Sequence, residues 1–443
     1  MKPLHETLLI TCWSNTQKAR VACQYPKLLM WTIMAVNHFI GSYQANSRRF
    51  CVKHAITAQV TDDRAAIDFK QHADEVKALY EAYAKKANDR VPITFMIDEQ
   101  FWLKQSKHSF MDFYSDPVVH LNAQLEGNHW FVNNIIGDMI PGIPDKWTVN
   151  TVHWMEENEF FGCDVVYQEN DYAWAKPLPM GKEDLLKHIA NLDPEAQVRK
   201  NSAYTLYWAL KELVEGRTFC DRPIEIAMPG RGTQGIFTKA AEIRGLEQLC
   251  LDMYDDPDWV VTYLALITEK SIARTKAWYR LINGLEMPVP AQEGFLGIDD
   301  SLQMISSELF ERFVLSCHEK YYSAFTKGWR GIHLCGRSMQ HYKILHDKLG
   351  ISLIDGPGLF ADHGLYLETL GPDLKINAQF DHTILAMGSE QDIESMTKKL
   401  LRPETKRPGR FQIKGYVHRL TKLENIARCY CLAKKHGMMN TGA

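Results

Sequence analysis

Short apolar runs alternate with longer amphipathic stretches from about residue 63 to the end of the chain. Apolar runs of about four to eight residues between turn-forming residues are typical of buried strands. The sequence predicts eight such strands, at residues 91–98, 164–169, 224–229, 294–299, 332–335, 351–355, 374–379 and 411–414. A helix-rich insertion separates the first strand from the second.

Helical patterns lie between the strands. Residues 65–86 are rich in Ala, Glu and Lys, which favour helix. Further helices are predicted at 240–253, 259–285, 307–327, 339–349, 390–401 and 423–436. Strands alternating with helices indicate βαβ units, and no dinucleotide-binding Gly-x-Gly-x-x-Gly follows the first strand. We therefore predict an α/β fold, a closed (β/α)8 TIM barrel with an N-terminal extension and a helix-rich insertion after the first barrel strand.

The first part of the chain differs from the rest. Residues 1–55 mix Cys, Trp, His and Arg without a sustained period or regular Gly and Pro punctuation. Three interpretations stay open: a segment that packs on the barrel, a partner-binding extension, or a poorly ordered leader. We divide the chain into an atypical extension, 1–55, and a barrel, 56–443.

Composition excludes several classes of function. The 443 residues carry a net charge of −3 without a basic run, so we expect neither nucleic acid nor a membrane surface as a partner. Ten cysteines without a Cys-x-x-Cys pair are typical of a reducing compartment. The apolar run 28–36 is too short to span a bilayer. These features predict a cytoplasmic enzyme with a small-molecule substrate.

Polar residues collect at the ends of the predicted strands. Active sites of TIM barrels lie at the carboxyl ends of the strands, so these positions are candidates for catalysis. They are Asp98, Glu169, Asp299, Asp300, Asp355, Gln379, Asp381, Tyr416 and His418. Each Asp alone equally fits a helix cap. Together, so many carboxylates on one rim favour a bound cation or a polar substrate.

The segment Gly-Ile-His-Leu-Cys-Gly at residues 331–336 carries a candidate ligand pair. Alternation along a strand places His333 and Cys335 on the same side, and both are zinc ligands. The alternative is packing, because Cys is among the most buried residue types. A second candidate is the glycine-rich turn at residues 230–235, where backbone amides and Arg231 suit an anion. We predict Arg231, Gly232 and Gln379 as cofactor-binding residues.

Several stretches together resemble the uroporphyrinogen decarboxylase superfamily. They are residues 89–92, 235–245, 254–259, 297–301, 305–315, 331–336 and 421–426, in the expected order over most of the last 350 residues or so. This superfamily contains a cofactor-free decarboxylase and zinc-dependent, corrinoid-linked methyltransferases. The resemblance implies the barrel fold already predicted.

The resemblance is closer to the methyltransferase branch. The decarboxylase has an arginine-rich loop for its poly-anionic substrate, whereas this chain reads Ile-Asp-Glu-Gln-Phe-Trp at residues 97–102. The methyltransferases hold zinc with His-x-Cys and a distant Cys. His333 and Cys335 match the first two positions, and Tyr416 stands at the third. His418 is then our predicted third ligand, with Asp299, Asp355 and His363 as alternatives.

The resemblance implies a methyltransferase that moves a methyl group between a corrinoid and a metal-activated nucleophile such as a thiol. The metal is zinc at His333, Cys335 and His418. The predicted catalytic residues are Asp98, Glu169, Asp299, Asp355 and Tyr416. A corrinoid protein and a second copy of the chain are expected partners. Two alternatives stay open: a metal-free decarboxylase with Asp98 and Arg231 near the reacting group, and a non-catalytic corrinoid- or tetrapyrrole-binding protein.

Overall fold

Six parallel strands form one curled sheet at the centre of the protein. The computed structural model describes residues 68–106, 108–152, 155–230, 232–284 and 292–439, so the predicted extension, 1–55, lies outside the described residues. The order in the sheet is β1-β11-β10-β9-β8-β7. The strands are β1 Ile93–Ile97, β7 Gln292–Ile298, β8 Thr326–His333, β9 Ile351–Asp355, β10 Lys375–Gln379 and β11 Phe411–Val417.

Strand β11 shows how the two faces of the sheet differ. Phe411, Ile413 and Val417 are buried, whereas Gln412 and Lys414 between them are half-buried. Apolar side chains at every second position pack against the surrounding helices, because alternate residues point to opposite faces. The other positions face the inside of the curl and are polar. The sheet therefore presents functional groups inward.

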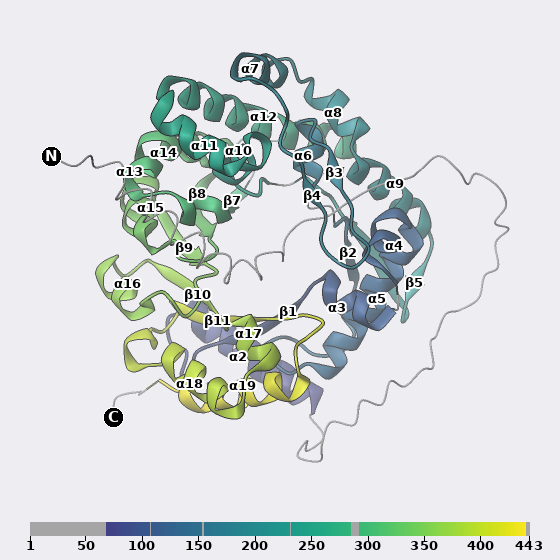
Figure 1. The fold of residues 1–443 in the computed structure, drawn as a ribbon. Helices are drawn as coiled ribbons and strands as arrows, with labels where there is room; N and C mark the ends of the chain where they lie inside the picture. The colour runs from purple at the N-terminus through teal and green to yellow at the C-terminus, as the bar shows by residue number, and fades with distance from the viewer. Residues whose placement is uncertain (1–67, 107, 153–154, 231, 285–291, 440–443) are drawn as a thin grey trace.

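Helices cover the outside of the sheet and follow one another around a ring in chain order (Figure 1). They are α10 Ile236–Arg244, α11 Leu246–Asp255, α12 Pro257–Asn283, α13 Ser307–Leu309, α14 Leu315–Phe325, α15 Tyr342–Leu349, α16 His363–Thr369, α17 His382–Met387, α18 Glu390–Leu400 and α19 Leu423–His436. The helix predicted at 240–253 is two helices, because Gly245 at φ 90° turns the chain between them.

The insertion after β1 changes the closure of the barrel. Its elements are α3 Glu99–Ser106, α4 Phe110–Ser115, α5 Pro117–Asn134, β2 Trp147–Asn150, α6 Glu156–Phe160, β3 Val165–Val166, β4 Trp174–Ala175, α7 Lys182–Ala190, α8 Pro194–Lys200, α9 Ser202–Val214, β5 Thr218–Phe219 and β6 Arg222–Ala227. The second and third predicted barrel strands form here as β3 and β6. They pair outside the six-stranded sheet.

The insertion supplies the competing partners. Strand β3 pairs antiparallel with β4, while β6 has β2 on one edge and β5 on the other. Because both edges of β6 are occupied, the pairings in the described residues give a curled six-stranded sheet and two small sheets rather than the predicted closed ring of eight strands. The α/β class and the parallel curl agree with the prediction.

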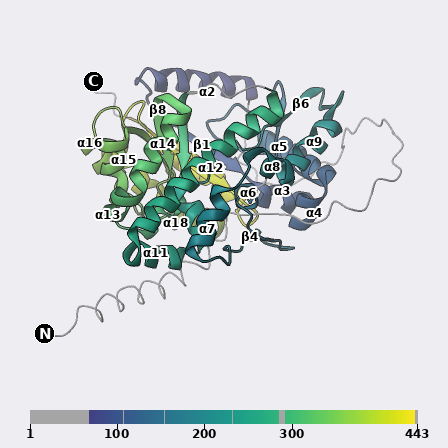
Figure 2. The same ribbon diagram turned by 90° about the horizontal axis from the view of Figure 1, so that it is seen from above.

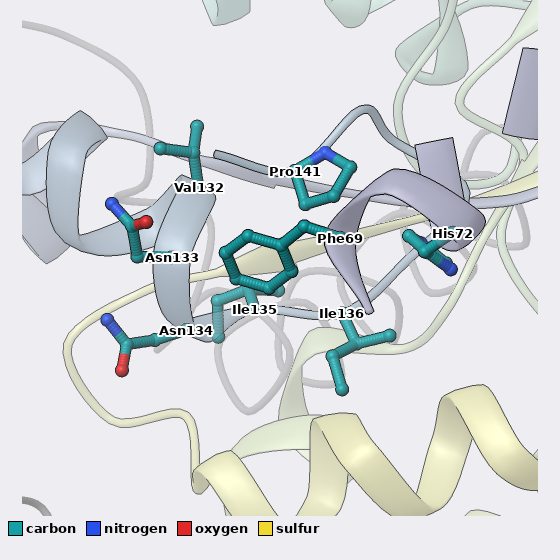
Figure 3. A pocket seen from close by; sticks show the side chains of 8 residues that line it. All are labelled: Phe69, His72, Val132, Asn133, Asn134, Ile135, Ile136 and Pro141. Carbon is teal, nitrogen blue, oxygen red and sulfur yellow. The ribbon is translucent and has the colours of Figure 1, made fainter. Parts of the chain in front are cut away.

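Helix α2, Phe69–Ala84, lies across one end of the sheet (Figure 2). Beneath it a small cavity is lined by Phe69, His72, Val132 and Pro141 among others (Figure 3). The His72 Nε2 atom lies 2.9 Å from the carbonyl oxygen of Gly137 and ties the helix to the loop after α5. This end is opposite the carboxyl ends of the strands, so it belongs to the scaffold. Among the described helices, none has the length and apolar character needed to cross a membrane.

Candidate metal site at the ends of strands β7 and β8

Three side chains with metal-binding atoms converge where β7 and β8 end. Asp300, His333 and Cys335 each offer one atom, and these atoms all lie within 4.8 Å of one another. His333 Nε2 is 3.5 Å from Cys335 Sγ and 3.7 Å from Asp300 Oδ1. Strands β7 and β8 are neighbours in Figure 1, and Ile298 is paired with His333. The register therefore brings Asp300 level with Cys335.

The local sequence explains the shape of this corner. Leu334 is fully buried, so His333 and Cys335 on either side of it point inward together. Gly336 then turns the chain at φ 64°, where a Cβ would lie 1.8 Å from the Gln303 side-chain oxygen. Only glycine fits this turn without displacing Gln303.

His333 is held in a fixed orientation by Asp355. Its Nδ1 atom lies 2.6 Å from Asp355 Oδ2, which leaves Nε2 facing Cys335 and Asp300. Lys414 Nζ is 2.5 Å from the same oxygen. Burial favours the protonated form of Asp355, but the hydrogen bond from His333 and the charge of Lys414 outweigh it and lower the pKa to about 2. Asp355 is thus ionised, and a carboxylate behind a ligating histidine is a common feature of zinc sites.

Among the described residues, no Lys or Arg is paired with Asp300 or Cys335. Burial raises the pKa of Asp300, although the charge of His333 opposes the shift. Burial and the charge of Asp300 raise the pKa of the Cys335 thiol well above its usual value. The nearby cation, Lys414, is paired with Asp355. A divalent cation would stabilise both ionised groups at once.

The donor set fits zinc. Nitrogen, sulfur and carboxylate oxygen are all zinc ligands, and bonds of about 2.0 Å to nitrogen and oxygen and about 2.3 Å to sulfur place tetrahedral nitrogen roughly 3.5 Å from sulfur and roughly 3.3 Å from oxygen. The 3.5 Å between His333 Nε2 and Cys335 Sγ agrees with this spacing, and the 3.7 Å between His333 Nε2 and Asp300 Oδ1 is slightly longer. Asp300 Oδ1 is buried and has no hydrogen-bond partner among the described residues. An orphaned carboxylate oxygen facing two other ligands supports a cation site.

Asp299, a predicted catalytic residue, lies in a different environment from its neighbour. Its Oδ2 atom accepts a hydrogen bond from the backbone of Phe237 at 3.0 Å, and Oδ1 accepts from the backbone and the hydroxyl of Thr238 at 2.9 and 2.7 Å. His318 Nε2 lies 2.9 Å from Oδ2. Fully buried Asp299 therefore caps the start of α10, which has no side-chain cap within its own sequence.

The end of β11 carries two further predicted residues. Burial and the charges of Asp355 and Cys335 raise the pKa of Tyr416, whose ring is 5.4 Å from that of His382. His418 lies 5.9 Å from the same ring. Both ring nitrogens of His418 are buried without a hydrogen-bond partner among the described residues. His418, the predicted third ligand, is thus beside His382, whereas Asp300 completes the cluster.

The remaining predicted residues are more widely spread. Asp98 accepts from the backbone of Gln100 at the start of α3, and burial raises the pKa of Asp98 to about 6. Glu169 is exposed in the β3–β4 hairpin. Gln379 ends β10 and is buried.

The glycine-rich turn and the alternative metal ligand His363 lie elsewhere. The carbonyl oxygen of Gly232 accepts a hydrogen bond from Arg274. Arg231 lies outside the described residues, and buried His363 begins α16 with its ring 5.7 Å from Phe411.

Sequence reasoning placed Asp300 on the rim but did not choose it as a ligand. The available signal was the alternation of β7, since Ile298 and Leu296 are two and four residues before Asp300, at positions that share its face. The sequence pattern also did not single out Asn377 and Gln412 on the inner face of the sheet. Asn377 donates a hydrogen bond to Asp355, and Gln412 donates one to Asn377.

A second group of buried charges lies in the insertion. Arg274 of α12 pairs with Glu156 and with Glu157 of α6, the latter at 3.3 Å. Trp278 Nε1 donates to Glu156 at 2.8 Å, and the backbone of Gln234 donates to Glu157 at 3.0 Å. These contacts tie the insertion and the glycine-rich turn to the barrel helices.

The fold and the cluster define an α/β protein of the TIM-barrel type with a candidate metal site on its rim. The sequence matches no protein-family model, and comparison with curated proteins gives no match. A methyltransferase from Methanosarcina mazei is similar in structure, with a TM-score of 0.54 at 15% identity over 80% of this chain and 97% of that one. This likeness shows the fold. A B12-independent methionine synthase from Shewanella sp. W3-18-1 overlaps 62% of this chain and 73% of its own at 10% identity, with a TM-score of 0.28, too low to support a common fold.

Proposed function

We propose that the protein is a methyltransferase of the uroporphyrinogen decarboxylase superfamily, in which zinc at Asp300, His333 and Cys335 activates a nucleophile such as a thiol. The donor is a methylated corrinoid. The convergence of the three ligand atoms carries this proposal. The motif resemblance and the shared fold with a protein described as a methyltransferase support it.

The chemistry needs a thiolate at neutral pH. A zinc ion held by Asp300, His333 and Cys335 would supply it by lowering the pKa of a bound substrate thiol, whose proton would leave to solvent. With a methylated corrinoid as the donor substrate, the thiolate would take the methyl group to form a thioether, and the electron pair of the broken cobalt–carbon bond would stay with the corrinoid.

The residues of the chain have distinct tasks in this proposal. Asp355 orients His333, and Asp300 supplies the negative charge that retains the cation. Tyr416, Asp98, Glu169 and His418 are proposed to contact the substrate. Arg231, Gly232 and Gln379 are proposed to contact the corrinoid. The proposal also includes a small-molecule substrate, a corrinoid protein as partner, a homodimer and a cytoplasmic location. It keeps the division of the chain into an extension, residues 1–55, and a barrel, residues 56–443.

The test is thiol-dependent demethylation of methylcobalamin by the zinc-loaded protein. We expect the absorbance change of the cobalt product with 2-mercaptoethanol as acceptor, and its loss in Cys335→Ala. Cys431→Ala is the matched control, because Cys431 is an exposed thiol on α19, outside the ligand cluster. Protein that carries one zinc per chain but transfers no methyl group to any thiol tested would refute the methyltransferase proposal.

A further inference from the structure

Four polar side chains form a row across four adjacent strands behind the candidate metal site. Gln412 on β11 is paired in register with Asn377 on β10, Asn377 with Asp355 on β9, and Asp355 with His333 on β8. Residues in register on parallel strands have side chains on the same face at the same height. The row therefore runs along the inner face of the sheet and ends at His333.

Hydrogen bonds connect the row in one direction. Gln412 Nε2 donates to Asn377 Oδ1 at 2.7 Å, and Asn377 Nδ2 donates to Asp355 Oδ1 at 3.2 Å. With its oxygen engaged by Gln412, the Asn377 amide can only present its NH₂ group to Asp355. Lys414 donates to the other carboxylate oxygen, Oδ2. Asp355 thus accepts hydrogen bonds from side chains of β10 and β11, and its Oδ2 atom lies 2.6 Å from His333 Nδ1.

We infer that Gln412, Asn377 and Lys414 are positioning residues that fix the tautomer of His333 through Asp355. Asp355 already accepts hydrogen bonds from Asn377 and Lys414, so it is also the acceptor toward His333 Nδ1–H, and the lone pair of the imidazole is on Nε2, the atom that faces Cys335 and Asp300. The inference rests on the proposed function for its purpose, the binding of a metal by Nε2. The tautomer itself is a property of the metal-free chain.

Charge makes Lys414 the main member of the row. The side chains of Asp355 and Lys414 are only 7% and 12% exposed, so each would be costly to bury alone. Lys414 and Asn377 hold the two oxygens of Asp355 from two strands, so loss of either contact frees the carboxylate to turn away from His333 Nδ1. Gln412 acts one step further away, because it only sets the direction of the Asn377 amide.

The first measurement is the imidazole tautomer by ¹⁵N NMR of the full metal-free chain at mildly alkaline pH, with His333 assigned by its loss in His333→Ala. We expect Nδ1–H in the wild type and a shift toward Nε2–H in Lys414→Met. Asn377→Leu should shift less, and Gln412→Ala, the mildest change, least. Lys375→Met is the matched control, since Lys375 lies on the same face of β10 and is exposed.

The second measurement is zinc affinity by chelator competition. Loss of residues that orient a ligating histidine lowers metal affinity by about 10–100-fold, and we expect a loss of this size for Lys414→Met and Asn377→Leu with none for Lys375→Met. An unchanged tautomer in both variants would overturn the inference, as would unchanged zinc affinity in both. A wild-type chain that shows the Nδ1–H tautomer but binds no zinc would instead refute the proposed function.

Discussion

Two buried groups of carboxylates in this protein differ in what neutralises them. In the insertion, Glu156 and Glu157 face the guanidinium of Arg274, so the negative charges have a cation within the chain. At the ends of β7 and β8, Asp300 faces His333 and Cys335, and its Oδ1 atom has no hydrogen-bond partner among the described residues. In the first group a guanidinium of the chain balances the carboxylates, although Glu157 Oε1 also lacks a hydrogen-bond partner among the described residues. The second has the composition of a site that is completed by a ligand.

The same contrast occurs between adjacent residues. Asp299 accepts hydrogen bonds from the start of α10 and contacts His318, whereas Asp300 points to the ligand cluster. The residue type is the same, but Asp299 is fully buried, whereas the Asp300 side chain is 22% exposed, and their partners differ. Asp299 is therefore expected to contribute to stability and Asp300 to binding.

The largest expected effect comes from breaking the internally paired group. Arg274→Met leaves Glu156 and Glu157 buried without their cation, and removing one partner of such a buried pair typically costs about 3–5 kcal/mol of the free energy of unfolding. Urea denaturation measures this difference.

The matched control is Arg280→Met on the same helix. Arg280 pairs with Glu195 at 2.7 Å, but both side chains are partly exposed, so we expect a change of at most about 1 kcal/mol. If Arg274→Met were no more destabilising than Arg280→Met, the insertion group would not be a stabilising network, and the contrast between the two groups would fail.

A smaller effect should separate the neighbouring carboxylates. Asp299→Ala removes the cap of α10 and the partner of His318, so we expect a loss of about 2 kcal/mol in the free energy of unfolding of the metal-free protein. Asp300→Ala should change that quantity by less than about 0.5 kcal/mol, or increase it, because the burial of Asp300 is unfavourable to its charge. The reverse order of the two variants would show that the assignment of the two residues is inverted.

The sequence was sufficient for the positions of the strands and for part of the site. Each of the eight predicted ranges overlaps a strand, although β8 begins at Thr326, before its predicted start at residue 332. Alternation also placed His333 and Cys335 on one face, where their side chains lie 3.5 Å apart, because both features depend on local pattern. Barrel closure depends instead on which edges pair. The predicted ring was not obtained because β2 and β5 of the insertion occupy the edges of β6.

The third member of the cluster also depends on long-range geometry. Asp299 and Asp300 are equivalent in a sequence pattern, and only the position of α10 against the end of β7 makes one a cap and the other a ligand candidate. The row behind His333 depends on the register of four strands that are separated by whole helices along the chain. No local pattern specifies that register.

The most direct measurement is the zinc content of purified protein after dialysis against metal-free buffer. We expect one zinc per chain in the wild type and in Cys431→Ala, and well under one in Asp300→Ala, His333→Ala and Cys335→Ala, each of which loses one of the three converging ligand atoms. A wild-type chain without zinc, or full zinc retained when Asp300 and Cys335 are both replaced, would contradict the metal site.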